Sequence, residues 1–416
     1  MQFELARTVD DGVGSVATVP DGAETDTAGG LRVELVKSQA DIPTDLWDAC
    51  FPPPLEGRWW YQTLEESGLE DQFSFSYAVV RQGARPVGIV PLFRSSLPLD
   101  VVVPDPLLPI GRVIERAAPD LIRPPTLFIG SPCSDEGAIG LLPDVDRRAA
   151  LLALQDWLVW HARQIRARVL IWKDLTAAWS ADFNWLMERR RLFKSISYPG
   201  SVVTLPGSSK EQYLTGLTSA RRQKFKRALK RGGELMPVRV EALQNPDAAT
   251  LDRMFALFEQ TYQHATTKFE RLNRNFFANI AKHPVSHFVI LREVKSGEIV
   301  AFVLCFLMGP HVINKFIGID RAQPSGAFLF LRLWDAMLDW SLAQGATSIQ
   351  SGQTGYSGKM QTGHQLVPLN NYCHVHNRGF HALFRFVGQR LTWQGLDKDL
   401  ATVITASPEM AAAQYV

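Results

Sequence analysis

The chain has 416 residues, of which 46% are hydrophobic and 21% charged, and its formal net charge is +2. A chain of this length exceeds one ordinary hydrophobic core and indicates two domains. The small net charge excludes polyanion binding by the molecule as a whole, so any contact with a nucleic acid must come from a local basic patch.

Four cysteines are scattered along the chain, and none stands at the spacing of a Cys/His metal site. This usage is typical of the reducing cytosol, and we expect a cytoplasmic protein without a metal. The start of the chain lacks the charged and apolar segments of a secretory signal. The longest apolar run, residues 299–308, suits a buried strand and is too short to span a membrane.

Residues 1–30 contain few apolar side chains and are predicted to form a disordered leader. The first folded half, residues 31–207, is predicted to contain a strand, two helices, a strand pair, a strand, a Gly-rich turn, a long helix and a final strand. Strands are expected at residues 31–36, 73–80, 87–93, 126–129 and 169–173. Helices are expected at residues 44–51, 59–67 and 144–166, and the Gly-rich turn at 130–137.

The second half repeats this plan over residues 235–391 and leaves a tail at 392–416. The shared order of elements predicts an α/β fold with two similar domains, each built on a mixed sheet. Strands are expected at residues 236–242, 287–293, 299–307, 312–319 and 346–350, and helices at 248–267, 273–282 and 326–344.

A basic helical linker, residues 208–234, is predicted between the two halves. Its residues 221–231 hold seven cations in eleven positions, and Thr218 or Ser219 is the candidate N-cap. One interpretation is a solvated linker helix. The other, which the near absence of balancing acids favours, is contact with a polyanion, namely the phosphates of CoA, an acidic carrier protein or a tRNA.

A strand at residues 312–319 leads through a Pro-Ser-Gly turn into the long helix. Unpaired N–H groups and the positive end of the helix dipole make such an N-terminus a ready site for an anion. This geometry suits the pyrophosphate or phosphopantetheine of a thioester donor. The residues expected to contact the donor are Gln323, Ser325, Gly326, Ala327, Lys359, Arg221 and Arg222.

The duplicated order of elements resembles a tandem pair of GNAT folds, the fold of a large N-acetyltransferase superfamily. The segment SARRQKFKRALKR and the stretches SGQTGYSGKMQTGHQLVP and CHVHNRGFHALF resemble FemAB-like bacterial acyltransferases. The resemblance covers residues 31–390. It implies transfer of an acyl or aminoacyl group to an amine, from an acyl thioester in some members and from aminoacyl-tRNA in others.

The phosphate loop departs from the pattern of that superfamily, which has Gln or Arg, two residues, Gly, one residue, and then Gly or Ala. Gln323 and Gly326 are in place, but Phe328 occupies the last position. This departure is at odds with conventional acetyl-CoA binding, and it is compatible with a bulky donor or a displaced pantetheine arm.

Polar residues after the last strand are candidates for catalysis and substrate binding. Lys359 is expected to neutralise a donor phosphate or to stabilise the oxyanion, and the alternative is an exposed loop lysine. Gln353 is a candidate partner of the pantetheine or the substrate amide, or else a turn residue. Tyr356 is a candidate donor to the leaving group, with core packing as the favoured alternative.

His374 is the leading candidate for the general base. It stands two residues from His376, so on a strand the two rings share a face, but without a third ligand the pair does not predict a metal. The alternative for His374 is a structural histidine bonded to backbone. His364 is a second base candidate that is assigned to substrate binding. Asp135, beside Glu136, is expected either to line an acceptor pocket or to start a helix.

The resemblance therefore implies an N-acyltransferase in which an amine of an amino acid or peptide attacks the donor directly, without a covalent enzyme intermediate. The expected donor is acyl-CoA or a phosphopantetheinyl acyl-carrier protein, with no tightly bound cofactor. The acceptor is expected in the cleft between the domains. The alternatives are an aminoacyl-tRNA-dependent Fem-type peptidyltransferase and a non-catalytic recognition module of the same fold.

Overall fold

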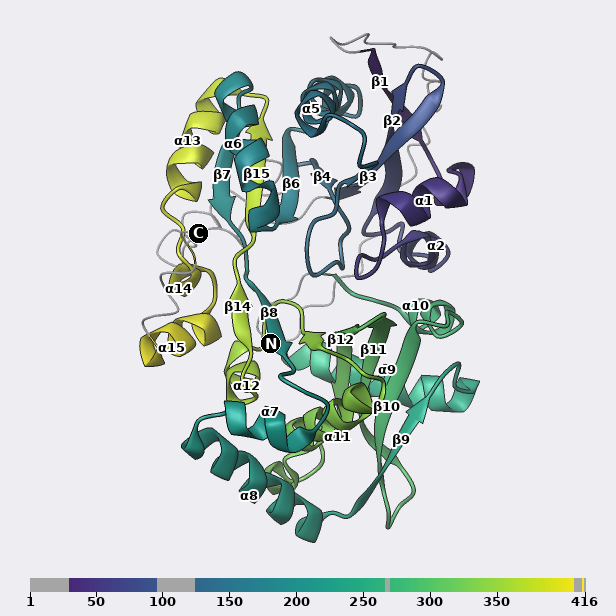
Figure 1. Ribbon diagram of the computed structural model, residues 1–416, viewed down its shortest axis with the longest axis vertical. Helices are drawn as coiled ribbons and strands as arrows, with labels where there is room; N and C mark the ends of the chain where they lie inside the picture. The colour runs from purple at the N-terminus through teal and green to yellow at the C-terminus, as the bar shows by residue number, and fades with distance from the viewer. Residues whose placement is uncertain (1–29, 96–123, 266–269, 408–413, 415–416) are drawn as a thin grey trace, which may run out of the picture.

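The computed structural model describes residues 30–95, 124–265, 270–407 and 414. Two mixed β-sheets lie one above the other in Figure 1, with helices packed against both. The predicted α/β class with two mixed sheets is confirmed. Most of the predicted leader lies outside the described residues.

The first sheet has the strand order β1-β2-β3-β4-β6-β15-β7, and β5 pairs with β3. Neighbouring strands of this sheet are antiparallel except β4 and β6. The parallel pairing of these two strands requires a crossover, which contains helix α5 (Arg147–Gln164). The strands are β1 (Leu31–Val36), β2 (Ser74–Gln82), β3 (Arg85–Ser95), β4 (Thr126–Ile129), β5 (Gly140–Leu141), β6 (Val169–Leu175), β7 (Phe193–Ile196) and β15 (Asn370–Val375).

The second sheet has the order β14-β8-β13-β12-β11-β10-β9. Again one pair is parallel, β12 with β13, and helix α11 (Leu329–Ala343) forms the crossover. The strands are β8 (Gly200–Thr204), β9 (Val238–Leu243), β10 (Ser286–Glu293), β11 (Ile299–Met308), β12 (His311–Ile319), β13 (Ser348–Gln350) and β14 (Gln365–Val367). Each sheet thus has four antiparallel strands followed by a helix and a parallel strand, which is the repeated order that the sequence predicts.

The two sheets exchange one strand each. β7 belongs to the first sheet, but β8, which follows it, pairs in the second; β14 belongs to the second sheet, but β15, which follows it, pairs in the first. The two crossing segments, residues 197–199 and 368–369, contact each other, because the Ser197 N–H donates to the Leu369 carbonyl at 2.9 Å. The sheets therefore do not coincide with the ranges 31–207 and 235–391 at these two strands.

One hydrophobic core joins the two sheets. Helices α1 (Thr44–Cys50) and α2 (Arg58–Glu65) pack in the same cluster as α9 (Ala248–His264) and α10 (Arg274–Ile280). The Trp59 and Phe306 rings are 4.9 Å apart, and the Trp60 and Phe276 rings 5.6 Å apart. Elements far apart in sequence therefore form a continuous apolar contact between the halves.

The basic segment forms helix α8 (Ser219–Leu235), and the Thr218 side chain caps it as predicted. Phe225 and Ala228 are buried in the core of the second sheet, beside α11. Gly232 lies against the Ala327 carbonyl, 2.5 Å from where a Cβ would be. α8 is therefore a packed part of the second half rather than a free linker.

The remaining elements complete the fold. The helices are α6 (Ser180–Arg189), α7 (Lys210–Gly216), α12 (Tyr356–Gln361), α13 (Arg378–Gly388), α14 (Trp393–Leu396) and α15 (Lys398–Ala406), with 3-10 turns η1 (Gln39–Asp41), η4 (Ala177–Trp179) and η5 (Ser325–Ala327). Within the described ranges, no helix is both long enough and apolar enough to cross a bilayer.

Candidate functional site

The parallel strands β12 and β13 separate where the candidate residues gather. They pair over only three positions, from His311 with Ser348 to Ile313 with Gln350. Beyond that point β12 continues beside β11, while the chain after β13 turns away through Thr354 and Gly355, both with positive φ. Residues 351–355, the 351–355 loop, therefore border the gap between the two strands.

Lys359 fixes the shape of this loop. Its Nζ donates hydrogen bonds to the carbonyls of Ser351 (2.5 Å), Gly352 (2.8 Å) and Gln353 (3.3 Å). Because C=O and N–H point in opposite directions across a trans peptide plane, the N–H groups of residues 352–354 face away from Lys359. Successive N–H groups of this kind form a concave site for negative charge.

Burial lowers the pKa of Lys359 to about 7, against the opposing effect of the Asp135 and Asp399 charges. Burial, followed by the Lys359 charge, lowers the pKa of His364 to about 3, so this ring is neutral at physiological pH. His364 Nε2 lies 2.9 Å from the Ser351 hydroxyl. The loop is thus supported by two side chains whose charged forms are disfavoured by their surroundings.

Facing the loop is Lys315 of β12, whose side chain is only 1% exposed. Its Nζ donates to Glu56 Oε1 at 2.7 Å and to Asp135 Oδ1 at 3.2 Å, and lies 4.8 Å from the Trp60 ring centre. Burial opposes the charge on Lys315, but the two carboxylates outweigh it and raise its pKa. Lys315 therefore links the second sheet to two acids of the first half.

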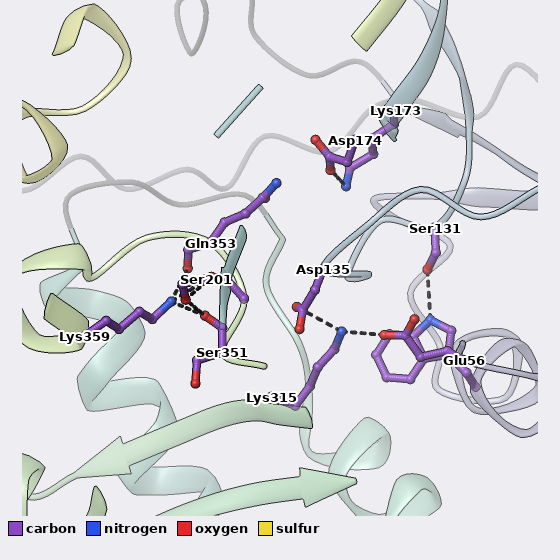
Figure 2. A network of polar contacts seen from close by, with 12 residues as sticks. Glu56, Ser131, Asp135, Lys173, Asp174, Ser201, Lys315, Ser351, Gln353 and Lys359 are labelled. Atoms are coloured by element: carbon purple, nitrogen blue, oxygen red, sulfur yellow. Dashed lines mark hydrogen bonds and ion pairs between the residues drawn. The ribbon is translucent and has the colours of Figure 1, made fainter. Parts of the chain in front are cut away.

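Asp135 lies between these two lysines (Figure 2). Its Oδ2 is buried and has no hydrogen-bond partner, although Oδ1 contacts Lys315. A Cβ on Gly352 would be 2.9 Å from Asp135 Oδ1, so the carboxylate lies directly against the 351–355 loop. A buried, unsatisfied carboxylate oxygen is costly and needs an explanation, which a bound cationic or N–H group would supply.

Glu136 is the second acid of the same segment, residues 130–137, which we term the 130–137 loop. Burial, followed by the nearby Glu56 and Asp135 charges, raises its pKa to about 7 against the opposing charge of Lys315. A carboxyl group with this pKa exchanges protons readily near neutral pH, as a general base must.

Asp174 lies at the far end of the site, near the end of β6, and its φ is 54°. It accepts a hydrogen bond from the Ser197 hydroxyl and forms an ion pair with Lys173. Its N–H donates to Asn371 Oδ1 at 2.8 Å. These contacts join β6 to the crossing segment 197–199 and to β15 next to the 130–137 loop.

Five predicted site residues come together around the 351–355 loop, namely Gln353, Tyr356, Lys359, His364 and Asp135. Gln353 Nε2 donates to the Tyr198 carbonyl at 3.0 Å, and the Tyr356 hydroxyl donates to the Pro199 carbonyl at 2.9 Å. Tyr356 is fully buried in a core cluster. Both side chains therefore anchor the loop to the crossing segment, and Tyr356 has the packing role named as its alternative.

The predicted donor-binding residues are divided between two places. Gln323, Ser325, Gly326 and Ala327 form the turn before α11, whose N-terminus has no side-chain cap. The Gln323 side chain donates to Asp320, and Ala327 is buried beneath the end of α8.

Arg221 and Arg222 lie at the opposite end of α8. Gly232, which packs on the turn, follows Arg222 by ten positions, which correspond to roughly 15 Å of helix. Arg222 donates to the Leu214 carbonyl at 3.3 Å. The structure therefore does not place these two arginines beside Gly326, because the helix that carries them runs away from the turn.

His374 lies elsewhere, on β15 within the first sheet. Its Nδ1 donates to the Arg191 carbonyl at 2.8 Å, and burial lowers its pKa to about 4. The His376 ring lies 5.1 Å away, on the shared face that the spacing predicts. The structure does not bring His374 to the 351–355 loop, because the exchange of β15 carries it into the other sheet.

Sequence reasoning missed Lys315, Glu56 and the raised pKa of Glu136. One signal was available: Asn314 and Lys315 interrupt an otherwise apolar strand. A lysine at a core position of a strand is rare unless it is paired. Its acidic partners come from segments nearly 200 residues or more away, which no local pattern could identify.

Comparisons with known proteins agree with this architecture. Residues 219–355 match the family model described as an acetyltransferase (GNAT) domain. No curated protein sequence matches the chain. The solved structure of FemX is similar at a TM-score of 0.55 and 12% identity, covering 85% of this chain and 100% of FemX.

Two further structures are similar at the level of the fold. L-PGS from Bacillus licheniformis gives a TM-score of 0.50 at 12% identity, covering 82% of this chain and 98% of that one. A conserved protein of unknown function from Bacteroides thetaiotaomicron gives 0.51 at 13% identity, covering 81% and 97%.

The family match extends from α8 to the 351–355 loop and so includes Lys315, the separating strands and the uncapped start of α11. Lys359 follows just beyond it. Residues 219–355 therefore form a GNAT acetyltransferase domain, and the chain as a whole has a fold similar to that of FemX.

Proposed function

We propose that the chain transfers an acyl group from a thioester, carried by CoA or by an acyl-carrier protein, to the amine of an amino acid or peptide. The observation that carries this proposal is the position of Asp135. Its carboxylate, from the first half, lies against Gly352 of the second half, and its Oδ2 has no hydrogen-bond partner. An acid at this seam suits an amine acceptor brought next to a donor held on the second sheet.

The acceptor half of the site is acidic. An incoming ammonium group would satisfy Asp135 Oδ2. Lys315 contacts both Asp135 and Glu56 but balances only one of their two negative charges, so the ammonium group would balance the other. Glu136, with a pKa of about 7, would take the proton that the amine must lose before it attacks.

The donor half of the site is formed by backbone. The uncapped N-terminus of α11 suits a phosphate of the carrier arm. The N–H groups of residues 352 and 353, oriented by Lys359, suit the donor carbonyl oxygen as it gains charge. Here Lys359 acts as a positioning residue, because its own donors are occupied by carbonyls.

The reaction follows from these roles. The ammonium group first gives one proton to Glu136, and the neutral amine nitrogen then attacks the thioester carbonyl carbon, so that a tetrahedral oxyanion forms beside the loop N–H groups. The C–S bond breaks as the carbonyl re-forms, and the second proton of the nitrogen passes to the departing thiolate, which leaves an amide and a thiol.

A direct test combines the purified protein with acetyl-CoA, a long-chain acyl-CoA or an acyl-carrier protein, and with a panel of amino acids and dipeptides. The proposal expects amine-dependent thiol release and an amide product that mass spectrometry detects. Thiol release without an amide, or no reaction with any thioester, would contradict the proposed donor class.

The alternative donor, an aminoacyl-tRNA, is favoured by one observation. α8 exposes Lys224, Lys226, Arg227 and Arg231, and the only ion pair recorded for this helix among the described residues is Lys230 with Glu234, at 4.0 Å. Such a surface attracts a polyanion. If charged tRNA alone yields a product, and this rate falls steeply with salt, the tRNA-dependent reaction replaces the thioester reaction.

A further inference from the structure

A basic cavity lies at the outer edge of the first sheet, away from the 351–355 loop. It has a volume of about 530 Å³ and lies between α5, the start of β7, the end of β15 and the start of α13. Figure 1 shows α13 packed beside β7 at this edge. The residues that carry the argument are Asp156, Arg163, Arg190, Arg191, His374 and Arg378.

The positive charge in this cavity exceeds the negative charge. Arg190 forms a bidentate pair with Asp156 at 2.5 and 2.6 Å. Arg191 donates instead to two backbone carbonyls, and no carboxylate partner of Arg163, Arg191 or Arg378 is recorded within the described ranges. Three cations are therefore left without a counter-ion in one cavity.

A buried ring with an unused nitrogen also lines the cavity. His374 is 5% exposed, and its Nε2 has no hydrogen-bond partner; both nitrogens of the neighbouring His376 are also without one. Because His374 Nδ1 donates to the Arg191 carbonyl, the neutral ring leaves Nε2 as a hydrogen-bond acceptor for an O–H group of a ligand. Arginines around such a ring suit the fork geometry of a phosphate group.

A second cavity, of about 520 Å³, adjoins the first, because Arg163 and His376 line both. Val375, Phe380 and Phe384 form an apolar part of its lining, and Arg166 and Arg168 lie at it beside Arg163. A ligand with a phosphate at one end and hydrocarbon at the other would suit the two cavities together.

Helix α13 extends the apolar surface into solvent. Phe380, Leu383 and Phe386 are 41%, 52% and 56% exposed, and they are half of the six large hydrophobic residues exposed in the described part of the chain. Their spacing of three places them on one stripe of the helix. Arg385 and Arg390 flank this stripe, and Arg390 stacks on Phe386 at 3.6 Å. Exposed aromatics among arginines characterise helices that lie in a membrane interface.

We propose that the basic cavity and α13 together bind an acidic phospholipid at a membrane surface. The phosphate lies among Arg163, Arg191, Arg378 and His374, and the stripe of α13 inserts among the acyl chains. This surface docks the protein and takes no part in acyl transfer, so it stands independently of the proposed reaction.

The test is sedimentation of the full chain with vesicles of phosphatidylcholine alone or with a quarter phosphatidylglycerol. Binding is expected only to the acidic vesicles.

The double variant Arg163→Gln, Arg378→Gln should weaken this binding by about 5-fold per arginine. The triple variant Phe380→Ser, Leu383→Ser, Phe386→Ser should weaken it by roughly 10-fold or more. The control Arg239→Gln with Val240→Ser removes one exposed arginine and one exposed apolar residue from β9 and should bind as the parent does.

The remaining outcomes overturn the proposal. Equal loss in the β9 control would show non-specific adsorption. Binding of glycerol phosphate in calorimetry, without sedimentation on acidic vesicles, would assign the cavity to a soluble phosphate ester instead. Absence of binding in both measurements would leave no anion ligand for the site. Circular dichroism of each variant distinguishes loss of binding from loss of fold.

Discussion

At the scale of single residues, the site depends on charges that are buried together. Lys315 satisfies two acids at once, and both belong to the other half of the molecule. Removing one member of a buried ionic cluster leaves the others uncompensated, which usually costs more than the cluster itself contributes.

Lys315→Met is expected to destabilise the protein by about 3–5 kcal/mol, because Glu56 and Asp135 would lose their shared cation. Lys210→Met is the matched control: Lys210 also contacts two acids, at 2.8 and 2.7 Å, but its side chain is 25% exposed. Its loss should cost about 1 kcal/mol or less. Urea unfolding measures both, and equal costs would refute the buried role of Lys315.

Glu136 makes a prediction that depends on pH. Its pKa rises from 4.5 when unfolded to about 7 when folded, so between these values the folded state holds more protons. Its contribution to stability therefore falls as pH rises from 4.5 to 7 and stays unfavourable above. Glu136→Gln should raise the unfolding midpoint at pH 8 and change it little at pH 5. Glu188→Gln, at an exposed position, should show no such difference.

At the scale of elements, the contact between α8 and the turn before α11 decides how the donor end of the site is held. Gly232 permits this contact, because a Cβ there would lie 2.5 Å from the Ala327 carbonyl. Gly233, its neighbour in the same helix, has open space at the same position.

Gly232→Ala should therefore destabilise the protein by roughly 1–3 kcal/mol through overpacking, although alanine favours a helix. Gly233→Ala should stabilise it by about 0.5–1 kcal/mol through helix propensity alone. Thermal unfolding of the two variants provides the comparison. If both stabilise, α8 is not packed on the turn as described.

The sequence correctly predicts features that depend only on residues close together in the chain. The cap at Thr218, the hairpin around Gln82 and Gly83, and the long amphipathic helix α5 lie where the sequence places them. The exchange of β8 and β15 was missed, since a short strand does not encode the sheet that it joins. For the same reason His374 was expected near Lys359.

At the scale of the whole molecule, the exchanged strands and the shared aromatic core tie the two halves together. Without β15, strands β6 and β7 of the first sheet would have no partner between them. Without α9 and α10, Trp59 and Trp60 would lose the surface on which they pack.

A fragment of residues 1–207 should therefore fail to fold, and the full chain should unfold in one cooperative step followed alike by near-ultraviolet and far-ultraviolet circular dichroism. A soluble fragment with dispersed amide resonances, or two separated transitions in the full chain, would show that the halves are independent.

The proposed role of Asp135, which is to present the amine acceptor to a donor on the second half, is tested most directly by kcat/KM for acyl transfer at saturating donor. The variant is Asp135→Asn, and the control is Asp144→Asn, because Asp144 is an exposed acid paired with Arg85. Asp135→Asn is expected to lose about 10²-fold or more of this rate constant, and the control is expected to lose none. Parent-like transfer by Asp135→Asn, with the fold intact, would contradict the proposed role.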